Sequence, residues 1–162
     1  MNPLEALFYV MLEKSSVDAQ RKAKFRDEQI ECLAKNIYFE ARNQSKAGKY
    51  AVAWVTQNRV DSSDFPNTIC KVVYQRKQFS WYWDGLSDVP QNPVAWAESQ
   101  EMATNFYNHH HKAKDITHGA LFYHAHYANV EYTRNWGRNY NVEVSVVIDD
   151  HIFYKPKKKK KS

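Results

Sequence analysis

Residues 36–60 read NIYFEARNQSKAGKYAVAWVTQNRV, and this stretch predicts two helices separated by a short break. Apolar residues recur at helical spacing before and after the break, which lies in the polar run NQSKAG. We expect the first helix to begin at an Asp27 N-cap and to end near Arg42. The second helix is expected to run from about Ala47 to about Arg59.

Glu40 lies at the edge of the apolar stripe of the first helix. At 100° per residue it falls about 80° from Ile30, just past Leu33. A carboxyl group against apolar side chains has its charged form disfavoured, so its pKa rises toward the range that suits a general acid. Periodicity alone favours a plainer interpretation, in which Glu40 forms an ion pair with Arg42, Arg59 or a lysine.

The sequence divides into three parts around this pair of helices. Residues 1–26 form the N-terminal part, with a short amphipathic helix expected over Leu4–Leu12. A polar stretch at 15–29, which is either a linker or an exposed helix, connects this part to the next. Residues 27–154 form the expected catalytic domain. Residues 155–162 are expected to be a disordered, lysine-rich tail.

Helical signals come first along the chain and strand signals come last. A short helix is expected at Ile69–Tyr74, and Asn92-Pro93 predicts an N-cap with proline at the first helical position, opening a helix that ends near Asn108. Three later segments are rich in β-branched and aromatic residues and predict strands: ALFYHAHY (120–127), VEVSVVI (142–148) and HIFYK (151–155). The expected fold class is therefore α+β, with a small antiparallel β lobe toward the C-terminus.

Composition limits the classes of function. The net charge is +5, but residues 154–162 hold six lysines, so the rest of the chain is slightly acidic and resembles no nucleic-acid-binding surface. The tail is expected to contact anionic polymers or a membrane surface. Two cysteines, Cys32 and Cys70, are too few for a disulfide-rich framework, and Cys32 is expected to be a small buried hydrophobe.

Several motifs resemble the SleB/CwlJ-type cell wall hydrolases, the spore cortex-lytic enzymes and their bacterial and phage relatives. The resemblance covers about 31–154. Its motifs occur in the family's order: IYFEAR (37–42), AVAWVTQNRV (51–60), FPNTI (65–69), QFSW (78–81), GALFYH (119–124) and HIFY (151–154). Many relatives carry an acid where this chain has Gln44.

The resemblance implies a peptidoglycan glycosidase with a lysozyme-like helical lobe and no cofactor. It implies that Glu40 is the catalytic acid of a lytic transglycosylase, which cleaves the bond between N-acetylmuramic acid and N-acetylglucosamine. Peptidoglycan glycan strands are the expected partner, and the chain is expected to be a monomer. Without a basic segment ahead of its first apolar run, the N-terminus is not expected to be a signal peptide. The resemblance then suggests a phage lysin, made in the cytoplasm and released to the wall through a holin.

The remaining candidate residues lie in two motifs. In QFSWYWDG, Gln78 and Ser80 are expected to bind substrate through hydrogen bonds, and Trp81 and Trp83 are expected to stack on sugar rings. Asp84 is a candidate second acid for lysozyme-type hydrolysis, or else caps the turn before Gly85. In the late strand, Tyr123 and His124 are expected to face the reacting centre or to fix Glu40; a buried tyrosine with a satisfied hydroxyl is the plain alternative.

Two rival functions stay open on the sequence alone. The histidines at 109–111, with His118, His124 and His126, supply enough imidazoles for a metal site, although neither HExxH nor a zinc-spaced cysteine pair is present. The aromatic residues and the lysine tail would also suit a non-catalytic peptidoglycan-binding module.

Overall fold

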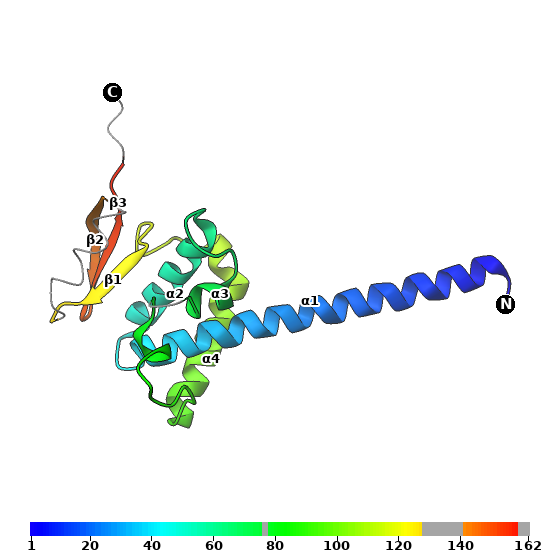
Figure 1. The fold of residues 1–162 in the computed structure, drawn as a ribbon, viewed down its shortest axis with the longest axis horizontal. Helices are drawn as coiled ribbons and strands as arrows, with labels where there is room; N and C mark the ends of the chain where they lie inside the picture. The colour runs from blue at the N-terminus through cyan, green and yellow to red at the C-terminus, as the bar shows by residue number, and fades with distance from the viewer. Residues whose placement is uncertain (76–77, 128–140, 159–162) are drawn as a thin grey trace.

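The computed structural model describes residues 1–75, 78–127 and 141–158 and confirms the α+β class. Four α-helices are followed by a three-stranded antiparallel sheet (Figure 1). The helices are α1 (Pro3–Ala41), α2 (Lys46–Asp61), α3 (Ile69–Val73) and α4 (Pro93–His109), with single 3-10 turns η1 (Ser80–Tyr82) and η2 (His110–Lys112). The strands are β1 (Phe122–Ala125), β2 (Val142–Ile148) and β3 (His151–Pro156), in the order β1–β3–β2.

The N-terminal region is one continuous helix, so the predicted start at Asp27 is wrong. α1 begins with a capping box, in which the Asn2 side chain accepts a hydrogen bond from the Glu5 N–H and the Glu5 side chain accepts one from the Asn2 N–H. After Pro3, which occupies the first helical position, the sequence has no glycine and no proline up to Ala41 to stop the helix. The polar stretch 15–29 is therefore helix, the second of the two forms predicted for it. Figure 1 shows the first half of α1 projecting away from the other elements.

The second half of α1 packs with α2, α3 and α4 to form the helical lobe. Fully buried apolar side chains from all four helices make its core, including Leu33, Ile37, Val52, Val72 and Ala103. The other helix predictions agree with the structure within two residues. Ser45 is the N-cap of α2, and Asn92 accepts a hydrogen bond from the Ala95 N–H ahead of α4.

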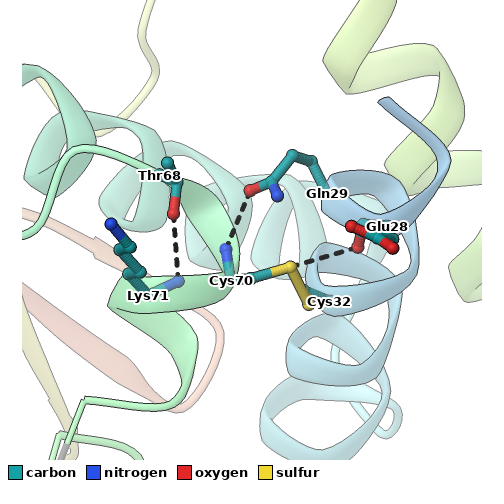
Figure 2. Close-up of a disulfide and its surroundings, with 6 residues drawn as sticks. All are labelled: Glu28, Gln29, Cys32, Thr68, Cys70 and Lys71. Atoms are coloured by element: carbon teal, nitrogen blue, oxygen red, sulfur yellow. Dashed lines mark hydrogen bonds between the residues drawn. A yellow bond between two sulfur atoms is a disulfide. The ribbon is translucent and has the colours of Figure 1, made fainter. Parts of the chain in front are cut away.

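A disulfide joins Cys32 of α1 to Cys70 of α3, with their Cα atoms 5.2 Å apart (Figure 2). Cys32 is buried in the core, as expected, but it is half of a disulfide and not simply a small hydrophobe. Spacing could not pair two cysteines 38 residues apart in sequence; α3 packs against α1 and brings them together. Beside the disulfide, the Gln29 side chain accepts a hydrogen bond of 2.9 Å from the Cys70 N–H.

The sheet packs against α2 through one face. Phe153 of β3 is fully buried and contacts Ala51 and Val55 of α2. In the antiparallel register Tyr123 of β1 lies opposite Phe153. β3 continues to Pro156, so the first two residues of the predicted disordered tail belong to a strand. Residues 157 and 158 follow without regular secondary structure, and residues 159–162 lie outside the described residues.

Within the described ranges, the search for a helix with the length and apolarity needed to span a bilayer finds none.

Candidate active site

The hydroxyl of Tyr123 donates a hydrogen bond of 2.8 Å to Oε2 of Glu40. Glu40 lies one residue before the end of α1, and Tyr123 is the second residue of β1, so the contact joins the helical lobe to the sheet. Glu40 is partly buried, as its place at the edge of the apolar stripe predicts. The contact fits both the role in which Tyr123 fixes Glu40 and the plain alternative of a buried tyrosine with a satisfied hydroxyl.

Burial raises the pKa of the Glu40 carboxyl above its ordinary value. The hydrogen bond from Tyr123 and the charge of Arg59 act in the opposite direction and favour the carboxylate. Burial, with the adjacent charge of Glu40, also raises the pKa of Tyr123 well above its ordinary value, so this phenol keeps its proton as a hydrogen-bond donor. The site therefore holds one carboxyl group with a raised affinity for a proton beside a permanent donor.

Two residues of α2 fix the chain just before β1. The Asn58 side chain donates hydrogen bonds to the carboxylate of Asp115 (2.9 Å) and to the carbonyl of Ala120 (3.0 Å). The Nε of Arg59 donates to the carbonyl of Leu121 at 2.7 Å. The segment that these contacts hold leads directly into Tyr123.

The Arg59 guanidinium is buried among aromatic rings. Its central carbon lies 5.1–5.6 Å from the ring centroids of Phe65, Phe79 and Phe122. This position gives a fixed positive charge close enough to Glu40 to lower the pKa of its carboxyl. Arg59 therefore acts on the site both through the backbone of β1 and through its charge.

The turn between β2 and β3 is tied to the start of α2. The Asp149 carboxylate accepts hydrogen bonds from the backbone N–H and the hydroxyl of Ser45, at 2.9 and 2.6 Å. Gln44 both donates to the Asp150 carboxylate and accepts from its backbone N–H, each at 3.3 Å. An amide suits this position, because an acid there would face two aspartates. Gly48 leaves room for the turn, since a Cβ on it would lie 2.5 Å from the Asp149 carboxylate.

Trp81 belongs to the core, which corrects the prediction that it stacks on substrate. Its side chain is 5% exposed, its ring stacks on Phe39, and its indole N–H donates to the Asn36 side chain at 3.0 Å. The Asn36 amide in turn donates to the Thr56 hydroxyl at 3.2 Å. An aromatic residue in a loop-like segment can be buried when the core contains a polar group that accepts its hydrogen bond. Here that group is Asn36, which in the sequence is only one polar residue within an apolar stretch of helix.

The other residues of this segment lie nearer the surface. Trp83 is half exposed, Ser80 is exposed and Gln78 is partly buried. The exposed Asp84 carboxylate accepts a hydrogen bond of 2.8 Å from the Leu86 N–H, across a turn in which Gly85 has a φ of 76°. Asp84 thus has the capping role that was its alternative prediction.

His124 does not share the position of Tyr123, because neighbouring residues on a strand point to opposite faces. Its ring stacks on Tyr154, and its Nε2 lies 2.7 Å from the Tyr154 hydroxyl. Of the predicted metal candidates, His110 instead contacts the carbonyl of Phe106, four residues earlier on α4. Among the described residues, the His, Cys, Asp and Glu side chains form no group of three or more placed to hold a metal ion.

His151 contributes to the site without having been predicted. It is 7% exposed, its ring centroid lies 5.1 Å from that of Tyr123, and burial lowers its pKa. Within the described chain its Nδ1 is buried without a hydrogen-bond partner. In the sequence, His151 could have been singled out only as the first residue of the HIFY motif. The register of β1 against β3 is what shows that His151 meets Tyr123.

The fold is that of an α+β domain, with a partly buried carboxyl group beside a tyrosine at the junction of a helical lobe and a small sheet. Residues 43–154 match the model of the Cell Wall Hydrolase family, and the chain belongs to this family. The match begins three residues after Glu40.

Relatives with curated descriptions agree with this assignment. The spore cortex-lytic enzyme of Bacillus cereus is 36% identical over 66 residues, which are 41% of this chain and 26% of that protein. The enzyme of the same name from Bacillus subtilis is 31% identical over 83 residues, 51% of this chain and 27% of that protein. The chain thus matches only about a quarter of the length of these relatives.

Solved structures show the same similarity at the level of the fold. The catalytic domain of the Bacillus cereus SleB protein superposes with a TM-score of 0.60 at 28% identity, covering 78% of this chain and 89% of that domain. The catalytic domain of the germination-specific lytic transglycosylase SleB from Bacillus anthracis gives a TM-score of 0.58 at 30% identity, covering 78% and 93%.

Proposed function

We propose that the chain degrades peptidoglycan as a lytic transglycosylase, with Glu40 as general acid and then general base. The observation that carries the proposal is the contact between Tyr123 and Glu40. A carboxyl group with a raised pKa holds a proton near neutral pH, and a fixed donor stabilises the carboxylate once that proton has left. The resemblance to a germination-specific lytic transglycosylase supports the same reaction.

In the proposed reaction one carboxyl group serves twice. Protonated Glu40 donates its proton to the oxygen that links N-acetylmuramic acid to N-acetylglucosamine, while the bond from that oxygen to C1 breaks. The Glu40 carboxylate then takes the proton of the muramic acid 6-hydroxyl as its oxygen bonds to C1. The product is a 1,6-anhydro sugar, no water is consumed, and Glu40 ends the cycle protonated.

Hydrolysis by water is the alternative outcome, and it requires a second group to activate the water. Asp84 was the candidate for that role. Its hydrogen bond to the backbone of its own turn favours the route that uses one carboxyl group.

Mass spectrometry of purified peptidoglycan digests tests the proposal. Muropeptides ending in 1,6-anhydro-muramic acid are expected; reducing-end muramic acid would indicate hydrolysis, and binding without released fragments would indicate a binding module. Glu40→Gln should lower turnover by about 10²–10⁴-fold, as expected for loss of a general acid. The matched control is Glu101→Gln, on the exposed face of α4, which should retain wild-type turnover.

We also infer that the chain works on the wall side of the cytoplasmic membrane. Disulfides persist in oxidising compartments outside the bacterial cytoplasm, and the Cys32–Cys70 bond suits such a place of action. A chain recovered only from the cytoplasmic fraction, with free thiols at both positions, would contradict this inference.

A further inference from the structure

The first 25 residues of the chain are exposed along their whole length. The first partly buried residue is Arg26, whose guanidinium donates a hydrogen bond to Asn108 at the end of α4. Before that point α1 projects alone, as Figure 1 shows, over about 35 Å at 1.5 Å per residue from Pro3. This stretch, residues 1–25, is called the free half of α1 below, and it lies outside the family match.

Large apolar side chains are exposed in this free half. Leu4, Phe8 and Leu12 are 78%, 59% and 50% exposed. Most of the stability of a helix in a protein comes from packing of an apolar face against other elements, not from helix propensity. The free half of α1 therefore has the composition of a helix that packs against something.

On one side of this helix, large apolar residues come early in the sequence and small residues come later. At 100° per residue, Leu4, Phe8 and Leu12 lie within the same arc of about 100° as Ser15 and Ala19. Along the helix axis the large apolar residues of the arc come first, and Ser15 and Ala19 follow, together with Lys22, which lies at the same angle as Leu4. A copy of this helix running antiparallel places large side chains against small ones, whereas a parallel copy places large against large.

The charges are also distributed unevenly along the free half of α1, with acids in its first part and bases in its second part. Glu5, Glu13 and Asp18 make the first part net acidic, although it contains Lys14. The stretch from Arg21 to Arg26 then carries four basic residues and no acid. An antiparallel copy brings the acidic part of each helix beside the basic part of the other, whereas a parallel copy places the two basic parts side by side.

In place of the monomer expected from the sequence, we propose that the free half of α1 pairs with the free half of a second copy in an antiparallel dimer. The overlap is the full free length, because the N-terminus of each helix then reaches the point where the other enters its helical lobe. The acids beside the large apolar residues disfavour the competing partner, an anionic membrane surface. The dimer holds two catalytic domains at opposite ends of a helical pair, which suits bivalent binding to a polymeric wall.

Sedimentation equilibrium of the full chain tests the pairing with matched substitutions. Phe8→Lys lies on the proposed interface, and Val10→Lys lies on the opposite side of the helix, although the two native side chains are almost equally exposed at 59% and 60%. Wild type and Val10→Lys should sediment at twice the monomer mass, and Phe8→Lys should raise the dimer dissociation constant about tenfold or more. Circular dichroism reports whether each variant keeps its helix.

Cross-linking then tests the direction of the helices. With the native disulfide left intact, a mixture of Phe8→Cys and Ala19→Cys chains should form a heterodimeric disulfide faster than either variant alone. Added salt should weaken the dimer, because its charges attract. A wild-type monomer at all concentrations, equal effects of the two lysine substitutions, or faster cross-linking of Phe8→Cys with itself would each overturn the proposal.

Discussion

The Tyr123 hydroxyl donates a hydrogen bond of 2.8 Å to the Glu40 carboxylate, although the two residues are 83 positions apart in sequence. The contact exists because two elements are fixed independently. The end of α1 is set by packing in the helical lobe, and the start of β1 is set by Asn58 and Arg59 of α2. α2 therefore connects the two halves of the site, and the predictions below concern the site, its supports and the disulfide.

Glu40→Gln should stabilise the fold near neutral pH while removing activity. Because burial raises the pKa of Glu40 in the folded state, the wild type is most stable below the unfolded-state pKa, taken as 4.5, and loses stability as pH rises through the folded pKa. A glutamine is neutral throughout. Chemical denaturation at several pH values should therefore show a difference that grows from acid to neutral pH. A constant difference would contradict a raised pKa.

Tyr123→Phe should shift the pH dependence of turnover. The tyrosine hydrogen bond lowers the pKa of Glu40, so its loss raises that pKa further. Because the proposed reaction needs protonated Glu40, activity should persist to higher pH, while its maximum falls about 10-fold through the lost stabilisation of the carboxylate. Rates measured across pH distinguish this effect from a loss of folding. A loss of folding would lower the rate without moving the pH at which activity declines on the alkaline side. A decline in activity that moves to lower pH would contradict the role of Tyr123 in lowering the pKa of Glu40.

Local signals in the sequence were sufficient for most of the fold. Periodicity and caps located α2 and α4 because Ser45 and Asn92 act within their own helices. Glu40 could be placed at the edge of a buried stripe for the same reason. The pairings across the chain were beyond such signals: the disulfide, the burial of Trp81 on Asn36, and the meeting of His151 with Tyr123 each depend on how separate elements pack. The sequence does not predict the single helix α1, because Asp27 resembles an N-cap. No helix-breaking residue lies just before Asp27, however, so the helix continues through it.

Asn36→Ala should destabilise the protein by about 1–3 kcal/mol, because it leaves the buried indole N–H of Trp81 without its acceptor. The Thr56 hydroxyl loses a donor in the same change. The free energy of unfolding from urea titration measures the effect. Asn105→Ala, on the exposed face of α4, is the matched control and should remain within about 0.5 kcal/mol of wild type. Equal effects at both positions would show that the buried network adds nothing.

Gln44→Glu should weaken the attachment of the β2–β3 turn to α2. The change replaces an amide donor with a charge beside Asp149 and Asp150, and exposed like charges cost roughly 0.5–1 kcal/mol. Because the repulsion is electrostatic, added salt should recover part of the loss. Unfolding measured at low and high ionic strength checks both statements. A loss of stability that salt does not change would point to altered packing instead of repulsion.

Reduction of the Cys32–Cys70 disulfide should lower the free energy of unfolding by about 2–4 kcal/mol, since the bond closes a loop of 38 residues in the unfolded chain. The bond also ties α3, which leads into the segment containing Trp81, to the helix that carries Glu40. Thermal unfolding with and without a thiol reductant measures the effect, and a double Cys32→Ser, Cys70→Ser variant is the control that reductant should leave unchanged. Because that variant keeps Glu40, Tyr123 and their hydrogen bond, it should retain activity at low temperature and lose it at a lower temperature than the oxidised wild type. A wild-type protein whose unfolding is insensitive to reductant would show that helix packing alone holds α3 in place.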